Sequence, residues 1–97
     1  MTSGDMVNDE VEVLNNQSMT IRPATSGIEW IIRNIYVPFG GSIELYRTDG
    51  TNAIKLLNSS TSLLSYQFHC SRDSYLTVKN VQVATVYLGY DGIISAE

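Results

Sequence analysis

Short runs of β-forming residues recur about every eight to twelve residues along this chain, and turn-forming residues separate them. No stretch of ten or more residues has the 3.6-residue apolar period of a helix. This spacing is typical of two antiparallel sheets packed face to face. The sequence therefore predicts an all-β fold, a single-domain antiparallel β-sandwich that is jelly-roll-like and has about eight short strands. The predicted strands are Val11–Leu14, Ser18–Arg22, Ile28–Val37, Ser42–Thr48, Ala53–Leu57, Leu63–Cys70, Tyr75–Lys79 and Thr85–Tyr90, followed by a short Ile93–Ser95 segment.

Two Asp-Gly pairs predict tight turns. Asp49-Gly50 lies between the runs Ile43–Tyr46 and Ile54–Leu56, and it is the strongest hairpin signal in the chain because glycine adopts positive φ at little cost. Asp91-Gly92 predicts a second tight turn near the C-terminus.

The charge is concentrated in the first twelve residues. Asp5, Asp9, Glu10 and Glu12 occur there without any Lys or Arg, so this segment alone accounts for the net charge of −4. The remaining chain is neutral, which disfavours nucleic acid as a partner. We therefore predict a flexible acidic arm over residues 1–12 and a sandwich domain over residues 13–97. The arm is either a solvated terminus or a segment that orders on a basic patch of a partner.

The third predicted strand, Ile28–Val37, is apolar on both faces. Simple alternation places Ile31, Ile35 and Val37 on the face opposite Trp30. Only one face of a sandwich strand meets the core, so the second apolar face needs a cover from outside. The sequence therefore predicts a homo-oligomer.

The residues that usually carry catalysis are scarce. His69 and Cys70 are the only histidine and the only cysteine. Neighbours on a strand point to opposite faces, so these two side chains cannot form a nucleophile–base pair, and together they are too few for a structural zinc site. We expect Cys70 in the core and His69 on the outer face. The sequence predicts a protein that is not an enzyme and uses no cofactor and no metal.

Cysteine usage and apolar runs suggest where the protein is made. A lone cysteine allows no intramolecular disulfide, which favours synthesis in a reducing cytoplasm. Residues 1–5 have no basic or apolar region of a signal peptide, so we expect none. Apolar runs of four residues or fewer predict no membrane-spanning helix.

Tyrosine is the most frequent aromatic residue, with six copies beside one tryptophan. Exposed tyrosines are common in both protein-binding and sugar-binding faces. We expect an interface wherever an outward cluster such as Tyr46, Tyr75 and Tyr87 forms.

Distinctive strand-and-turn segments occur at Gly27–Tyr36, Ile43–Tyr46 with Asp49-Gly50, Phe68-His69, Tyr75–Asn80 and Gly89–Gly92. Together they resemble a family of small structural proteins of tailed bacteriophages, the capsid decoration or cement proteins made beside the major capsid protein. The resemblance covers roughly residues 18–94 and excludes the acidic arm. It lies in strand-and-turn signatures rather than a catalytic motif, and the loop at Asn58–Ser62 departs from the glycine-rich loop of the family.

The resemblance implies a homotrimer seated on the outer face of the capsid, where it clamps neighbouring shell subunits. Localisation would then be the virion surface, after synthesis in the host cytoplasm. A tail, baseplate or head–tail accessory module is an alternative, and so is a carbohydrate-binding β-sandwich. The candidate residues for contact with other copies or with the major capsid protein are Asp5, Asp9, Glu10, Glu12, Ile31, Ile35, Val37, Tyr46, Tyr75 and Tyr87.

Overall fold

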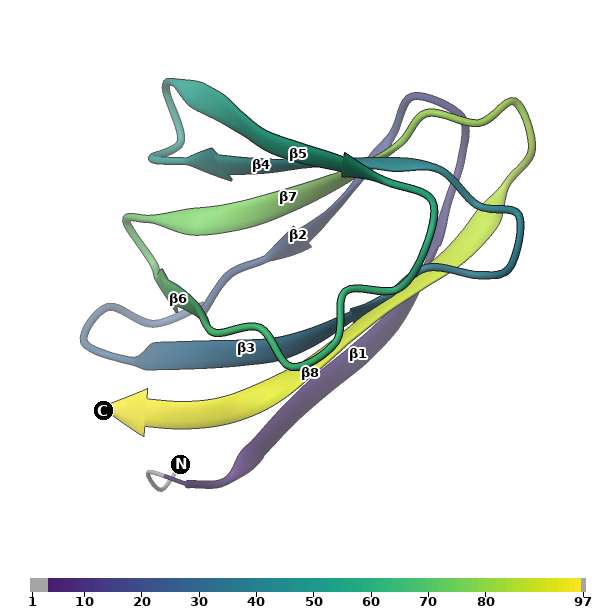
Figure 1. The fold of residues 1–97 in the computed structure, drawn as a ribbon. Helices are drawn as coiled ribbons and strands as arrows, with labels where there is room; N and C mark the ends of the chain where they lie inside the picture. Colours follow the sequence, from purple (N-terminus) through teal and green to yellow (C-terminus); the bar gives the residue numbers. More distant parts are fainter. Residues whose placement is uncertain (1–3, 97) are drawn as a thin grey trace.

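The structure is a computed structural model that describes residues 4–96. Eight strands form two sheets, and none of the described residues forms a helix able to cross a membrane. The strands are β1 (Met6–Val13), β2 (Ser18–Ile21), β3 (Glu29–Tyr36), β4 (Ile43–Thr48), β5 (Ala53–Ser59), β6 (Phe68–Ser71), β7 (Tyr75–Asn80) and β8 (Val86–Ala96) (Figure 1).

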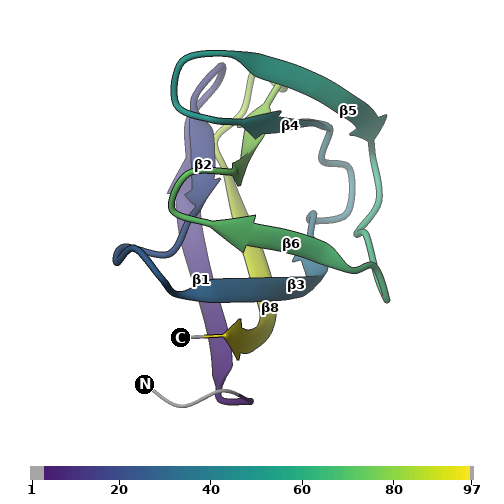
Figure 2. The same cartoon turned by 90° about the vertical axis from the view of Figure 1, so that its left-hand side faces the viewer.

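The two sheets each contain four antiparallel strands. The first sheet has the order β1-β8-β3-β6, and the second has the order β2-β7-β4-β5. The pairs β1/β8, β2/β7, β3/β6 and β4/β5 are nested within one another along the chain, which is the pairing of a jelly roll. Figure 2 shows the two sheets facing each other across the core. The predicted all-β sandwich is confirmed.

The core lies between the sheets and is filled mainly by aliphatic side chains. Because side chains alternate along a strand, each strand sends every second residue inward. The second sheet contributes inward pairs such as Met19 on β2 opposite Val78 on β7. The fully buried side chains of the core are Val13, Met19, Ile21, Ile32, Ile35, Ile43, Leu45, Leu76, Val78, Leu88, Ile94 and the single polar residue Asn80.

The N-terminal segment differs from the flexible arm expected over residues 1–12. Strand β1 pairs with β8 along its whole length. Val7 and Val11 pack against the core and Val13 is buried within it, while the acidic residues between them remain exposed. An edge strand tolerates such charges because its outer face and its free edge are both solvated. Residues 1–3 lie outside the described residues.

Strand β3 does not have the two apolar faces that simple alternation predicts. Its register with β8 passes over Arg33, which leaves one extra residue on β3. Such a bulge reverses the alternation beyond it. As a result Ile32, Ile35 and Val37 all point into the same core, where they are buried.

The basis on which the sequence predicted a homo-oligomer is therefore gone. The expected placement of Ile35 and Val37 on an outer apolar face is wrong, because the core of the same chain covers both side chains. Only Ile31 stays outside the core cluster. It is half-buried and lies opposite Ile93 of β8 and His69 of β6.

The two Asp-Gly pairs have different outcomes. Asp49-Gly50 forms the predicted β4–β5 hairpin turn, with Gly50 at φ 96°. The turn predicted at Asp91-Gly92 is wrong, since both residues lie within β8. Gly92 faces the bulge of β3, where an added Cβ would overlap the carbonyl oxygen of Ile31 and approach the Cα of Ile32 to 2.8 Å. This glycine is needed for close backbone approach rather than for a turn.

Candidate functional site

His69 and Cys70 take the positions predicted for them. Cys70 is buried in the core and His69 is exposed. Burial raises the pKa of the Cys70 thiol to about 11, so the thiol stays protonated at neutral pH. Among residues 4–96, no group of three or more His, Cys, Asp or Glu side chains is placed to hold a metal ion.

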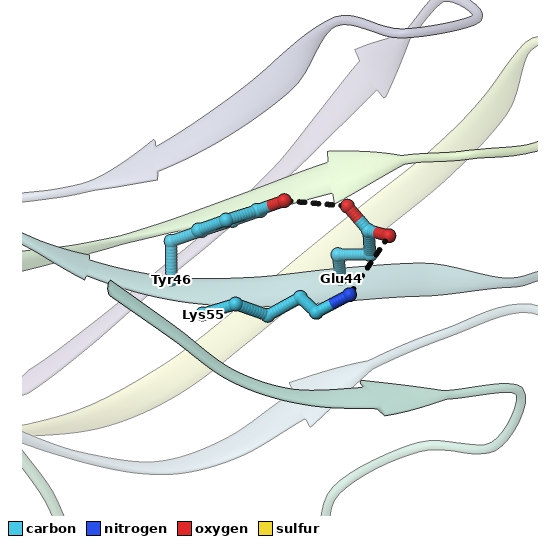
Figure 3. Close-up of polar contacts among 3 residues, drawn as sticks. All are labelled: Glu44, Tyr46 and Lys55. Atoms are coloured by element: carbon cyan, nitrogen blue, oxygen red, sulfur yellow. Dashed lines mark hydrogen bonds and ion pairs between the residues drawn. The ribbon is translucent and has the colours of Figure 1, made fainter. Parts of the chain in front are cut away.

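Tyr46, one of the predicted contact residues, is part of a polar cluster on the outer face of the second sheet (Figure 3). Its hydroxyl donates a 2.6 Å hydrogen bond to Glu44, and Lys55 on β5 lies 3.4 Å from the other carboxylate oxygen. The hydrogen bond from Tyr46 is the main reason that the pKa of Glu44 is lowered, and it raises the pKa of Tyr46. The Tyr46 hydroxyl is thus engaged within its own sheet.

The predicted cluster of Tyr46, Tyr75 and Tyr87 does not form. Tyr75 is only 9% exposed, and the guanidinium of Arg22 stacks 4.3 Å above its ring centroid. Tyr87 is exposed but belongs to β8 in the first sheet, whereas Tyr46 and Tyr75 belong to the second. The spacing of strands in the sequence does not show which sheet each strand joins. The prediction therefore grouped tyrosines that belong to different sheets.

The acidic residues predicted as part of the arm lie in or next to β1, the edge strand of the first sheet. Asp9, Glu10 and Glu12 are exposed on β1, and Asp5 precedes that strand. Asp5 also belongs to the sheet through its backbone, since its carbonyl accepts a 2.9 Å hydrogen bond from Ile94. The backbone that carries these exposed carboxylates is therefore part of the first sheet.

A feature that the sequence did not indicate lies at one end of the sandwich. The loops at residues 14–17, 38–42 and 81–85 meet there, at the right of Figure 1, and we call them the loop end. None of their residues carries a charge. Phe39 is fully exposed and Val83 is 93% exposed, and two further apolar side chains in these loops, Leu14 and Val81, are exposed as well.

The loop end is held together by Asn80, which is buried at the end of β7. Its side-chain amide donates to the carbonyl of Val13 at 3.0 Å and to that of Ala84 at 2.9 Å, and its side-chain oxygen accepts from the backbone N–H of Gln82 at 2.9 Å. All hydrogen-bonding groups of the side chain are therefore satisfied, as a buried amide requires.

Gln82 and Asn15 extend this network between the loops. The side-chain amide of Gln82 donates to the carbonyl of Gly40, and that of Asn15 donates to the carbonyl of Gln82. The N–H of Val81 donates to the carbonyl of Ser42 at 3.2 Å. The exposed apolar side chains of the loop end are thus presented by loops that are already ordered.

The opposite end of the sandwich, which faces the viewer in Figure 2, has a different composition. Its loops contain Arg22, Asp49, Arg72 and Asp73. The loops at the two ends therefore differ in their content of charged residues, although the four charges at this end sum to zero. The sequence contained the signal for this difference, since Phe39 and Val83 are apolar residues inside turn segments, but only the fold shows that their loops meet.

No protein-family model matches the chain, and no curated protein matches it. The candidate site consequently rests on the geometry of the loop end.

Proposed function

We propose that this protein is a non-enzymatic virion structural protein that decorates the head of a tailed bacteriophage. In this proposal the loop end docks on the outer face of the major capsid protein. The single observation that carries it is the uncharged, hydrogen-bonded loop end on which Phe39 and Val83 are exposed.

The physical reason is the cost of leaving that surface in water. Burying a large apolar side chain contributes about 1.5–3 kcal/mol. An interface core is depleted in charge, and its anchors are commonly aromatic. Loops that are already hydrogen-bonded to one another lose little conformational entropy on docking. The resemblance to small phage decoration proteins supports the capsid as the surface that covers the loop end.

Co-sedimentation of the purified protein with mature capsids of the encoding phage tests the proposal. We expect saturable binding to wild-type capsids. Phe39→Ser and Val83→Ser should each weaken it by about tenfold or more, as for anchors in an interface core. Ile54→Ser is a matched control, because Ile54 is also an exposed aliphatic residue but lies on the edge strand β5.

The proposal fails if the wild-type protein does not bind capsids, or if Phe39→Ser and Val83→Ser bind as well as Ile54→Ser. Electron microscopy of virions labelled on this protein separates the locations. Label distributed over the head supports decoration, whereas label at one vertex or along the tail supports an accessory module. The resemblance also implies a homotrimer. Sedimentation equilibrium at about 10–50 μM, the concentration range of a moderate association, tests this: a trimer mass supports it and a monomer mass contradicts it.

A further inference from the structure

The outer face of the first sheet carries a second surface feature, which borders the loop end at Pro38. Strand β8 presents Tyr87, Gly89 and Asp91 on this face because side chains alternate along a strand. In the register of the sheet, Gly89 lies between Glu10 of β1 and Tyr36 of β3. In the same way, Asp91 lies between Asn8 and Asn34.

Because Gly89 has no side chain, the side chains of Glu10 and Tyr36 lie close to its backbone. An added Cβ would lie 3.3 Å from Cγ of Glu10 and 3.6 Å from Cδ2 of Tyr36. The Tyr36 hydroxyl reaches Asp91, two residues along β8, with a 2.5 Å hydrogen bond. The ring of Tyr36 therefore runs along β8 from Gly89 to Asp91, and the residue remains 41% exposed. This arrangement provides an aromatic platform that lies on the sheet.

Asp91 is fixed at the hydroxyl end of that platform. One carboxylate oxygen accepts from Tyr36, and the other accepts a 2.7 Å hydrogen bond from the amide of Asn34. Asn34 is held in turn, since its side-chain oxygen accepts from the N–H of Ser65 at 3.0 Å. Each oxygen of Asp91 still has a free lone pair with which to accept from a ligand. The hydrogen bond to Asp91 is also the main cause of the raised pKa of Tyr36, which keeps its hydroxyl a donor.

Two hollows adjoin the platform, and both are lined in part by Tyr36 and Glu10. The larger, of about 320 Å³, is lined by Asn8, Asp9, Glu10, Tyr36, Tyr90 and Asp91. The other, of about 210 Å³, extends toward Tyr87 and Gly89. Neither lining contains Lys, Arg or His, so nothing there would pair with a phosphate, a sulfate or a carboxylate.

From this geometry we infer that the outer face of the first sheet binds a neutral sugar, with a pyranose ring stacked on Tyr36 and its hydroxyls hydrogen-bonded to Asp91 and Asn8. A pyranose has an apolar C–H face that suits an aromatic platform, and its hydroxyls are donors that suit a fixed carboxylate. A few polar groups convergent on an apolar surface are typical of small-ligand sites. The carboxylates of Glu10 and Asp91 in these linings would also attract a cation, so the test compares the neutral sugar with a polyamine.

The test begins with an array of neutral, anionic and amine-bearing glycans. The best neutral ligand is then titrated to about 10 mM into ¹⁵N-labelled protein while amide resonances are followed. We expect shifts at Tyr36, Gly89 and Asp91 and a dissociation constant of about 0.1–1 mM. Tyr36→Ala should weaken binding by about tenfold or more, whereas Tyr36→Phe keeps the ring and should lose only about threefold.

Tyr46→Ala is the control, because Tyr46 lies on the other sheet, and this variant should bind like the wild type. The inference is overturned if no neutral glycan on the array binds, if the shifted resonances map elsewhere, if Tyr36→Ala binds normally in a folded spectrum, or if spermidine shifts the same resonances as strongly as the sugar. The inference does not depend on capsid docking, so each proposal can fail without the other.

Discussion

Glu44 on β4 is a half-buried carboxylate whose pKa is shifted by its neighbours. The hydroxyl of Tyr46 donates to one of its oxygens and Lys55 approaches the other, and the nearby charges of Lys55 and Lys79 act in the same direction. Together these groups hold the pKa of Glu44 below the ordinary 4.5, although partial burial opposes them. The interaction therefore stabilises the folded protein only while Glu44 is ionised.

The sign follows from linkage. A carboxyl whose pKa is lower in the folded state stabilises it above the unfolded pKa, and the effect is lost as the pH falls through the folded pKa. We expect Glu44→Gln to be less stable than wild type at about pH 6, with the difference disappearing toward about pH 3. Urea unfolding at several pH values measures it. Tyr46→Phe should reduce the pH dependence of the free energy of unfolding in the same way. If Glu44→Gln and wild type differ in free energy of unfolding by the same amount at both pH values, the explanation is wrong.

Gly92 is required for a different reason, the proximity of two backbones. A Cβ at this position would overlap the carbonyl oxygen of Ile31 beside the bulge of β3. We expect Gly92→Ala to lower the free energy of unfolding by about 3 kcal/mol or more, because backbone rather than a flexible side chain must move. Gly89→Ala is the matched control on the same strand. There the nearest contacts are 3.2 and 3.3 Å, and the expected loss is about 1 kcal/mol or less. Equal losses, measured by denaturant titration, would contradict the distinction.

At the scale of elements, β1 decides the state of the N-terminal segment. Removing residues 1–12 would leave β8 without its β1 partner and would remove Val7 and Val11 from the edge of the core. We expect this deletion to cost about 5 kcal/mol, comparable to the whole stability of a small domain. Thermal unfolding followed by circular dichroism measures the effect.

The control for this deletion keeps the strand and removes only its charges. The triple variant Asp9→Asn, Glu10→Gln, Glu12→Gln should unfold within about 1 kcal/mol of wild type, because these side chains are exposed on β1. A deletion that unfolds like wild type would instead mean that residues 1–12 are dispensable for the fold.

In β3 the alternation of apolar residues predicted the strand correctly, but it assigned some side chains to the wrong face of the sheet. The run Ile28–Val37 was correctly expected to be a strand, and Glu29–Tyr36 forms β3. A single extra residue at Arg33 then reversed the alternation. Composition does not mark the position of a bulge, since it depends on how the partner strand approaches. Here the partner strand is β8, which carries Gly92 opposite the bulge, where the sequence had predicted a tight turn.

At the scale of the whole molecule, the jelly roll separates two kinds of surface. Its connections alternate between the ends of the sandwich, so uncharged loops gather at one end and charged loops at the other. The outer face of the first sheet adds an acidic and aromatic surface between them. The two proposals, docking through the loop end and sugar binding on this outer face, therefore concern different surfaces of one molecule, which adjoin at Pro38.

Local sequence patterns were enough to predict the all-β class, the β4–β5 hairpin at Asp49-Gly50, and the opposite orientations of His69 and Cys70. Each of these depends on local backbone preference or on the alternation within one strand. The order of strands, the bulge at Arg33 and the meeting of Phe39 with Val83 at the loop end were decided only by tertiary structure. They depend on contacts between residues far apart in the chain, and a pattern of period two does not specify which strands become neighbours.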